Sequence, residues 1–193
     1  MVIKRCFQST GYLTCYFFVM LLFSCATKPD FQKPAAPETG DHNVYQVLEE
    51  KIPETARRYM GIPYQLGADP DKTNGSDCSH LVSAVTRNSL SGSGFRLHST
   101  YFNSASIKKN SYPINKSDVR VGDIVFFKNE DGRSASNHSG IVTRKQGTVI
   151  FFAQASSSKG VIETSTVSES WREYWQYRLD SFRRWKKSVF VRG

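Results

Sequence analysis

The residue best suited to chemistry in this 193-residue sequence is Cys78. It directly follows Asp77, a residue type that often caps helices. An apolar stripe at helical spacing comes next, formed by Leu81, Val82 and Val85. The pattern therefore predicts a helix that begins at Cys78. Because a helix N-terminus stabilises a thiolate, we expect the pKa of this thiol to be lowered and the thiol to be nucleophilic.

A cysteine nucleophile needs a base, and histidine is the usual one. The sequence contains four candidates, His42, His80, His98 and His138. His80 lies two residues from Cys78 in the predicted helix, and residues at that spacing do not face each other. His138 follows the polar residues 132–137 and opens a predicted strand, so it lies on a rigid element. We predict that His138 is the base; an ordinary histidine at the end of a loop is the alternative.

The first 43 residues are expected to direct and tether the protein. Lys4 and Arg5 precede an uncharged apolar run over residues 12–23, as in a secretory signal peptide, and the run is short for a membrane span. It ends in residues 22–25 (LFSC), which resemble a bacterial lipobox. We expect a signal peptide over 1–24, a lipidated Cys25, and a tether rich in proline and alanine over 25–43.

The predicted cleavage and lipidation determine which cysteines remain as free thiols. Cleavage would remove Cys6 and Cys15, and lipidation would use Cys25, so Cys78 would be the last thiol of an exported chain. A single thiol in an oxidising compartment is either a reactive group or a buried structural cysteine. Cysteine usage alone supports both readings about equally.

Charge and composition limit the partners. The net charge of +9 suits an anionic setting such as wall polymer or phospholipid, and the predicted export argues against nucleic acid. The sequence has no HExxH motif and no paired-cysteine site, so we expect no metal and no cofactor.

Residues 44–193 are expected to form one domain of the α+β class. Helical patterns cover about 44–60 and 77–90, and β-branched or aromatic runs follow at 123–128, 138–144, 148–153 and 160–165. Part of 177–191 could supply one more strand. Helices that precede strands in this way predict N-terminal helices packed on an antiparallel sheet.

Five motifs resemble, in order, the NlpC-type family of papain-like bacterial cell-wall cysteine peptidases. They are residues 61–67 with 76–82 (GIPYQLG and SDCSHLV), 121–127 (VGDIVFF), 138–142 (HSGIV), 152–161 (FAQASSSKGV), and 174–175 with 183–184 (YW and RR). The resemblance covers roughly residues 54–186 and is closest to the small lipoprotein endopeptidases of Gram-negative bacteria. It implies a papain-like fold.

The resemblance also implies roles for single residues. Cys78 would be the nucleophile, His138 the base, and Gln154 the group that orients the imidazole. Substrate-binding roles would fall on Tyr64, Asp77, Ser79 and His98. Packing alone could explain Tyr64, and helix capping alone could explain Asp77. The sequence departs from the family's pattern at Ala68, His80 and His98.

The activity implied is that of a peptidoglycan hydrolase, a cysteine endopeptidase acting on stem-peptide or cross-link amide bonds. Its partners would be peptidoglycan and, through the lipid, a membrane of the cell envelope, the outer membrane in a Gram-negative host. Two alternatives remain open: a non-catalytic wall-binding lipoprotein, and a thiol amidase or acyltransferase on the same fold. The sequence names no activating partner.

Overall fold

The computed structural model describes residues 43–128 and 138–193. The predicted signal peptide, Cys25 and all of the predicted tether except Asn43 therefore lie outside the described residues. Within the described ranges, no helix has the length and apolar character that crossing a membrane requires.

Two helices form where the sequence predicts them. Helix α1 (Val44–Arg57) begins after Asn43, whose side chain accepts a hydrogen bond from the N–H of Tyr45 at 3.2 Å. Helix α2 (Cys78–Ser89) begins after Asp77, whose carboxylate accepts the N–H of His80 at 2.8 Å. These caps satisfy N–H groups that a helix cannot pair internally. A third, short helix, α3 (Ser104–Lys109), was not predicted.

A six-stranded sheet follows in the order β2-β7-β3-β4-β5-β6, and every neighbouring pair is antiparallel. Its strands are β2 (Ser111–Ile114), β3 (Ile124–Phe127), β4 (His138–Gln146), β5 (Val149–Ser156), β6 (Gly160–Ser165) and β7 (Leu179–Trp185). Two short strands, β1 (Phe95–Leu97) and β8 (Phe190–Arg192), pair separately. The predicted helix-then-sheet order is confirmed, whereas β1 and β2 were missed.

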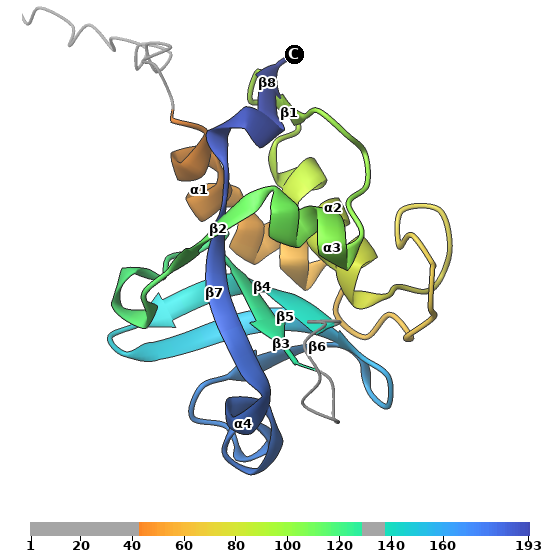
Figure 1. Ribbon diagram of the computed structural model, residues 1–193. Helices are drawn as coiled ribbons and strands as arrows, with labels where there is room; N and C mark the ends of the chain where they lie inside the picture. Colours follow the sequence, from red (N-terminus) through yellow and green to blue (C-terminus); the bar gives the residue numbers. More distant parts are fainter. Residues whose placement is uncertain (1–42, 129–137) are drawn as a thin grey trace, which may run out of the picture. The chain divides into compact units, whose positions relative to one another are not determined.

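Short helical turns complete the chain between these elements. They are η1 (Lys116–Asp118), the π-helical turn η2 (Trp171–Trp175), α4 (Gln176–Arg178) and η3 (Lys187–Val189). Figure 1 shows α1 and α2 on one side of the sheet and the segment around α4 beyond its other side.

The alternation of side chains along the strands produces two hydrophobic clusters. One face of the sheet packs against α1 and α2 through residues that include Ile124, Phe126, Ile141, Ala153 and Ala155. The alternate positions belong to a second cluster with the η2 segment, made of Val119, Val125, Phe127, Val142, Ile150, Phe152, Trp171 and Phe182. Both faces are therefore apolar, as in a sheet covered on two sides.

One buried ion pair joins two neighbouring parts of the sheet. Asp123, only 1% exposed, receives hydrogen bonds from Arg184 Nε at 2.8 Å and from Nη2 at 2.9 Å, a bidentate arrangement. The N–H of Arg120 adds a third bond, at 2.8 Å. The carboxylate thus holds the turn before β3 against β7.

We expect Asp123→Ala to lower the free energy of unfolding by about 3–5 kcal/mol, because Arg184 would keep a desolvated charge without its partner. Urea denaturation measures the change. Glu54→Ala is the matched control, since it breaks an exposed ion pair with Arg58 at 2.6 Å and should change stability far less. Equal losses in the two variants would contradict the role of the buried pair.

Candidate active site

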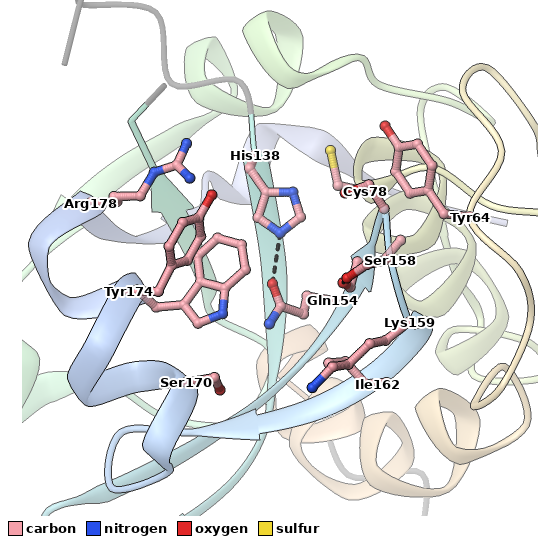
Figure 2. Close-up of a pocket in the computed structure, with 14 residues that line it drawn as sticks. Tyr64, Cys78, His138, Gln154, Ser158, Lys159, Ile162, Ser170, Tyr174 and Arg178 are labelled. Atoms are coloured by element: carbon pink, nitrogen blue, oxygen red, sulfur yellow. Dashed lines mark hydrogen bonds between the residues drawn. The ribbon is translucent and has the colours of Figure 1, made fainter. Parts of the chain in front are cut away.

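All three predicted catalytic residues line one pocket. Cys78, His138 and Gln154 surround a cavity of about 720 Å³ together with Tyr64. They come from the start of α2, the start of β4 and from within β5, and Figure 2 shows His138 between Gln154 and Cys78. Residues far apart in the chain thus meet at one site.

Cys78 is the first residue of α2 and is 7% exposed. Burial raises the pKa of its thiol, and the charge of Asp77 acts in the same direction, while hydrogen bonds from Ser139 and Ser104 oppose them. The pKa is raised as a whole, so the lowered value predicted from the helix N-terminus is wrong. Loss of water around the buried sulfur is the largest cause of the rise. The resting form is therefore the neutral thiol.

His138 is held by Gln154. The distance from its Nε2 to Gln154 Oε1 is 2.7 Å, and because a carbonyl oxygen can only accept, Nε2 carries the proton. The amide nitrogen of Gln154 donates to Thr164 Oγ1 at 2.7 Å, which sets the orientation of this fully buried amide. The ring's other nitrogen, Nδ1, is left as a base on the edge facing Cys78 (Figure 2).

Burial also lowers the pKa of His138, and the positive charge of Arg178 lowers it further, although the bond to Gln154 acts the other way. The imidazole is accordingly neutral under ordinary conditions. A neutral thiol beside a neutral imidazole can become an ion pair by transfer of one proton, so the site can generate a thiolate on demand.

Trp175 covers the imidazole, a contact that the sequence did not predict. Its ring lies parallel to that of His138, with centroids 4.9 Å apart and an interplanar angle of 21°. The ring of Phe127 packs against both. Its centroid lies 5.8 Å from that of His138 and 4.7 Å from that of Trp175. The π-helical turn η2 places Trp175 there, and such turns often occur at functional sites. The Tyr-Trp motif was the available signal.

Tyr64 reaches the same pocket from the loop before α2. Its backbone forms a bridge with Ser76, and its side chain lies beside Cys78 (Figure 2). Burial raises the pKa of the phenol, and the nearby Cys78 and Asp77 raise it further, so the hydroxyl stays a hydrogen-bond donor. A substrate-binding role for Tyr64 fits this position and stays a prediction.

Asp77 and Ser79 lie outside the pocket lining. The Asp77 carboxylate accepts the N–H of Gly67 at 2.9 Å and the hydroxyl of Ser79 at 2.8 Å, in addition to capping α2. Ser79 also lies 3.1 Å from the hydroxyl of Tyr101. Both side chains therefore hold the surrounding loops onto the helix, and their predicted contacts with substrate remain untested.

His98 lies apart from Cys78 and His138. It is exposed, packs edge-on against Phe102 with centroids 5.2 Å apart, and does not line the pocket. The structure does not bring it to the other predicted site residues.

His80, a departure from the family's pattern, has its own partners. Its Nδ1 lies 3.0 Å from Asp77 Oδ2, and its ring stacks on Tyr101 with centroids 3.9 Å apart. The extra bulk therefore fills a space beside the helix start and does not enter the space between Cys78 and His138.

Among residues 43–128 and 138–193, no group of three or more histidine, cysteine or acidic side chains could hold a metal ion. The chemistry available within the described pocket is that of a thiol, an imidazole with a defined tautomer, and the N–H groups at the start of α2.

Comparisons with known proteins identify relatives in sequence and in fold. A curated relative from Haemophilus influenzae, described as a probable endopeptidase, is 28% identical over 128 residues, which cover 66% of this chain and 71% of that protein. Solved structures also match. A Staphylococcus aureus protein of the NLP/P60 family, described as similar to lipoprotein, has a TM-score of 0.52 at 23% identity, over 71% of this chain and 41% of that one.

Two further structures share the fold. An NlpC/P60 family protein from Bacillus cereus has a TM-score of 0.51 at 17% identity, over 71% of this chain and 40% of its own. NlpC2 from Trichomonas vaginalis has a TM-score of 0.52 at 19% identity, over 72% of this chain and 47% of its own. The chain thus spans less than half the length of these three structures.

The family itself is established by sequence. The sequence model of the NlpC/P60 family matches residues 61–184, about two thirds of the chain and the part that carries the pocket. The resemblance predicted from the five motifs and the α+β fold that it implied are both confirmed. This chain belongs to the NlpC/P60 family.

Proposed function

We propose that this protein is a cysteine endopeptidase that cleaves amide bonds in the peptides of peptidoglycan. The observation that carries the proposal is the 2.7 Å contact between His138 and Gln154 in the pocket that also holds Cys78. Members of the NlpC/P60 family are generally cysteine peptidases, and the relative described as a probable endopeptidase supports the same class.

The first step is attack of Cys78 Sγ on the carbonyl carbon of the scissile amide. His138 Nδ1 takes the thiol proton as the carbon–sulfur bond forms, so charge develops only when substrate is in place. N–H groups of the first turn of α2 stabilise the oxyanion of the tetrahedral intermediate. The imidazolium then gives its proton to the leaving amine, and the amide bond breaks.

The second step regenerates the enzyme. Water loses a proton to His138 and attacks the thioester carbonyl, which releases the carboxylic acid product and the Cys78 thiol. Gln154 accepts from Nε2–H throughout, so the ring keeps the orientation that presents Nδ1 to the sulfur. Thr164 in turn keeps the Gln154 amide from rotating.

The proposed location follows from the N-terminal sequence. Lipid on Cys25 would anchor the tether to a membrane of the envelope. Loss of Lys4 and Arg5 with the signal peptide would leave a net charge of 9 − 2 = +7, which suits an anionic polymer such as peptidoglycan. One structural relative is itself described as similar to lipoprotein.

Replacing Cys78 with Ser or His138 with Ala should lower the rate of muropeptide cleavage by several orders of magnitude, since each removes a group that forms or breaks bonds. Gln154→Ala keeps both groups, so its rate of cleavage should fall by less. The assay is digestion of purified muropeptides with identification of products by mass spectrometry. His98→Ala is the control: because His98 does not line the pocket, this variant should keep the wild-type kcat.

The products also separate the alternatives. Cleavage within stem peptides or cross-links supports an endopeptidase, release of peptide from sugar indicates an amidase, and new peptide–acceptor adducts indicate an acyltransferase. Cleavage that survives in Cys78→Ser would overturn the assignment, and binding of muropeptides without any turnover would favour a wall-binding protein.

As pH falls, kcat/KM should decline with a midpoint below the ordinary imidazole pKa of about 6.5. The base must be neutral to accept a proton, and burial lowers the pKa of His138, so activity persists to lower pH than for an exposed histidine. Trp175→Ala admits water to the ring and should move this limb to higher pH. Tyr177, which is 76% exposed, supplies the control Tyr177→Ala. An unmoved limb in Trp175→Ala would show that Trp175 does not shield the imidazole.

Cys25→Ser should release the protein from membranes, because no thiol would remain at the end of the signal-like segment to receive lipid. Fractionation of cells into membrane and soluble parts measures the change, and Cys15→Ser serves as the control because it leaves residues 22–25 intact. The anchoring proposal fails if Cys25→Ser remains with the membrane fraction to the same extent as the wild type.

A further inference from the structure

Two segments of this chain carry positive charge and no acidic side chain. Residues 78–117 and residues 181–193 each contain five lysines or arginines and no aspartate or glutamate. The fold brings the two segments together, because β1 pairs with β8 and β2 pairs with β7. Positive charge that is spread along the sequence is therefore concentrated in one region of the domain.

Three exposed lysines lie where the two segments meet. The ammonium group of Lys186 donates to the carbonyl of Lys109 at 2.8 Å, and the N–H of Lys186 donates to the carbonyl of Asn110 at 2.9 Å. Lys187 is the next residue, and all three lysines are exposed. Lys109, Lys186 and Lys187 are called the basic patch below.

The charge of the basic patch is not neutralised by acidic side chains. In the part of the chain that the structure describes, no carboxylate forms an ion pair with any of the three lysines. Arg184 differs, since it is paired with Asp123. Arg183 adds a further positive charge near the patch, because its guanidinium donates to the carbonyls of Lys108 and Ser111, at 3.1 and 2.8 Å, and these acceptors are neutral.

The chain enters the domain beside the basic patch. In the first turn of α1, the hydroxyl of Tyr45 donates to the carbonyl of Trp185, the residue before Lys186, at 2.7 Å. The ring of Tyr45 also packs edge-on against that of Phe190, with centroids 6.0 Å apart. The predicted tether would run from the lipid on Cys25 to the start of α1, so it would join the domain next to the patch.

The catalytic pocket lies away from the basic patch, and none of the three lysines lines it. Strand β7 runs between the two regions: it begins directly after the pocket residue Arg178 and ends directly before Lys186. A strand of this length spans about 20 Å. Figure 1 shows α4, which precedes β7, and β8, which follows it, at opposite ends of the domain. A surface in contact with the patch would therefore leave the pocket open.

We propose that the basic patch docks the domain on the anionic phospholipid headgroups of the membrane that holds its lipid anchor. The inference goes beyond the peptidase function and rests on the proposed lipidation of Cys25. The chain from Cys25 to the start of α1 would reach at most about 65 Å when fully extended. The lipid would thus keep the patch close to a surface that attracts lysines within a short range.

The position of the patch favours lipid over wall polymer as the partner. The patch lies where the tether would arrive, whereas the polymer is the proposed substrate of the distant pocket. A lipid anchor and a basic surface act together in stable membrane attachment. Docking through the patch would also turn the pocket away from the membrane, toward the space in which peptidoglycan lies.

The test uses full-length protein purified from membranes and reconstituted into vesicles of phosphatidylglycerol or of phosphatidylcholine. The rate of amine labelling at Lys109, followed by mass spectrometry, measures the ratio of docked to undocked domain. Labelling should be slower in phosphatidylglycerol, and added salt should remove the difference. Lys187→Gln should lower the ratio about fivefold, the factor expected for one charge at an anionic surface, and Lys187→Arg should keep it.

Lys159 supplies the matched control. It is exposed and lies in the turn between β5 and β6, beside the edge of the sheet opposite β2. Its own labelling should be the same in both kinds of vesicle, and Lys159→Gln should leave the protection of Lys109 unchanged. Equal losses of protection in Lys159→Gln and Lys187→Gln would show an effect of net charge alone and would overturn the inference.

The same samples separate this inference from the earlier proposals. The mass of the N-terminal peptide reports lipidation. Lipidated protein whose Lys109 reacts equally in both kinds of vesicle would overturn docking and leave the anchor standing. Protection of Lys109 by soluble peptidoglycan fragments, and not by phosphatidylglycerol, would assign the patch to wall polymer and would also overturn it. Muropeptide cleavage by Lys187→Gln in detergent solution should match the wild type, so the peptidase proposal is tested independently.

Discussion

A fully buried amide must find hydrogen-bond partners inside the protein, and Gln154 finds them on both sides of its own strand. Its oxygen accepts from His138 on β4 and its nitrogen donates to Thr164 on β6, so three adjacent strands are joined by one side chain. The tautomer and direction of the imidazole follow from this constraint. Everything else at the site is arranged around a histidine whose reactive nitrogen already has a defined direction.

The sheet register makes that contact possible. Gly140 lies directly opposite Gln154 in the pairing of β4 with β5, two residues along from His138. A Cβ at Gly140 would lie 2.7 Å from the carbonyl oxygen of Ala153 and 3.0 Å from the ring of Phe152. A side chain at this position would force the two strands to shift, and His138 and Gln154 would shift with them. Close approach of backbones is thus part of how the histidine is placed.

Local signals made much of this predictable from sequence. Asp77 as a cap identifies the start of α2, and β-branched runs separated by short turns identify β3 to β6, because these features depend on neighbours in the chain. The short strands β1 and β2 were missed because each pairs with a segment at least 68 residues away. The π-helical turn that brings Trp175 to His138 has no simple periodic signature.

The thiol's pKa was mispredicted for a similar reason. A helix N-terminus can be recognised in sequence, whereas the burial of Cys78 depends on the packing of α2 against β4. That burial has a chemical consequence beyond catalysis. Peroxides and disulfides react with the thiolate rather than the thiol, so a cysteine kept protonated at rest is oxidised slowly. For an exported chain, as its N-terminus predicts, this protection would preserve the one thiol on which turnover depends until a peptide occupies the cleft.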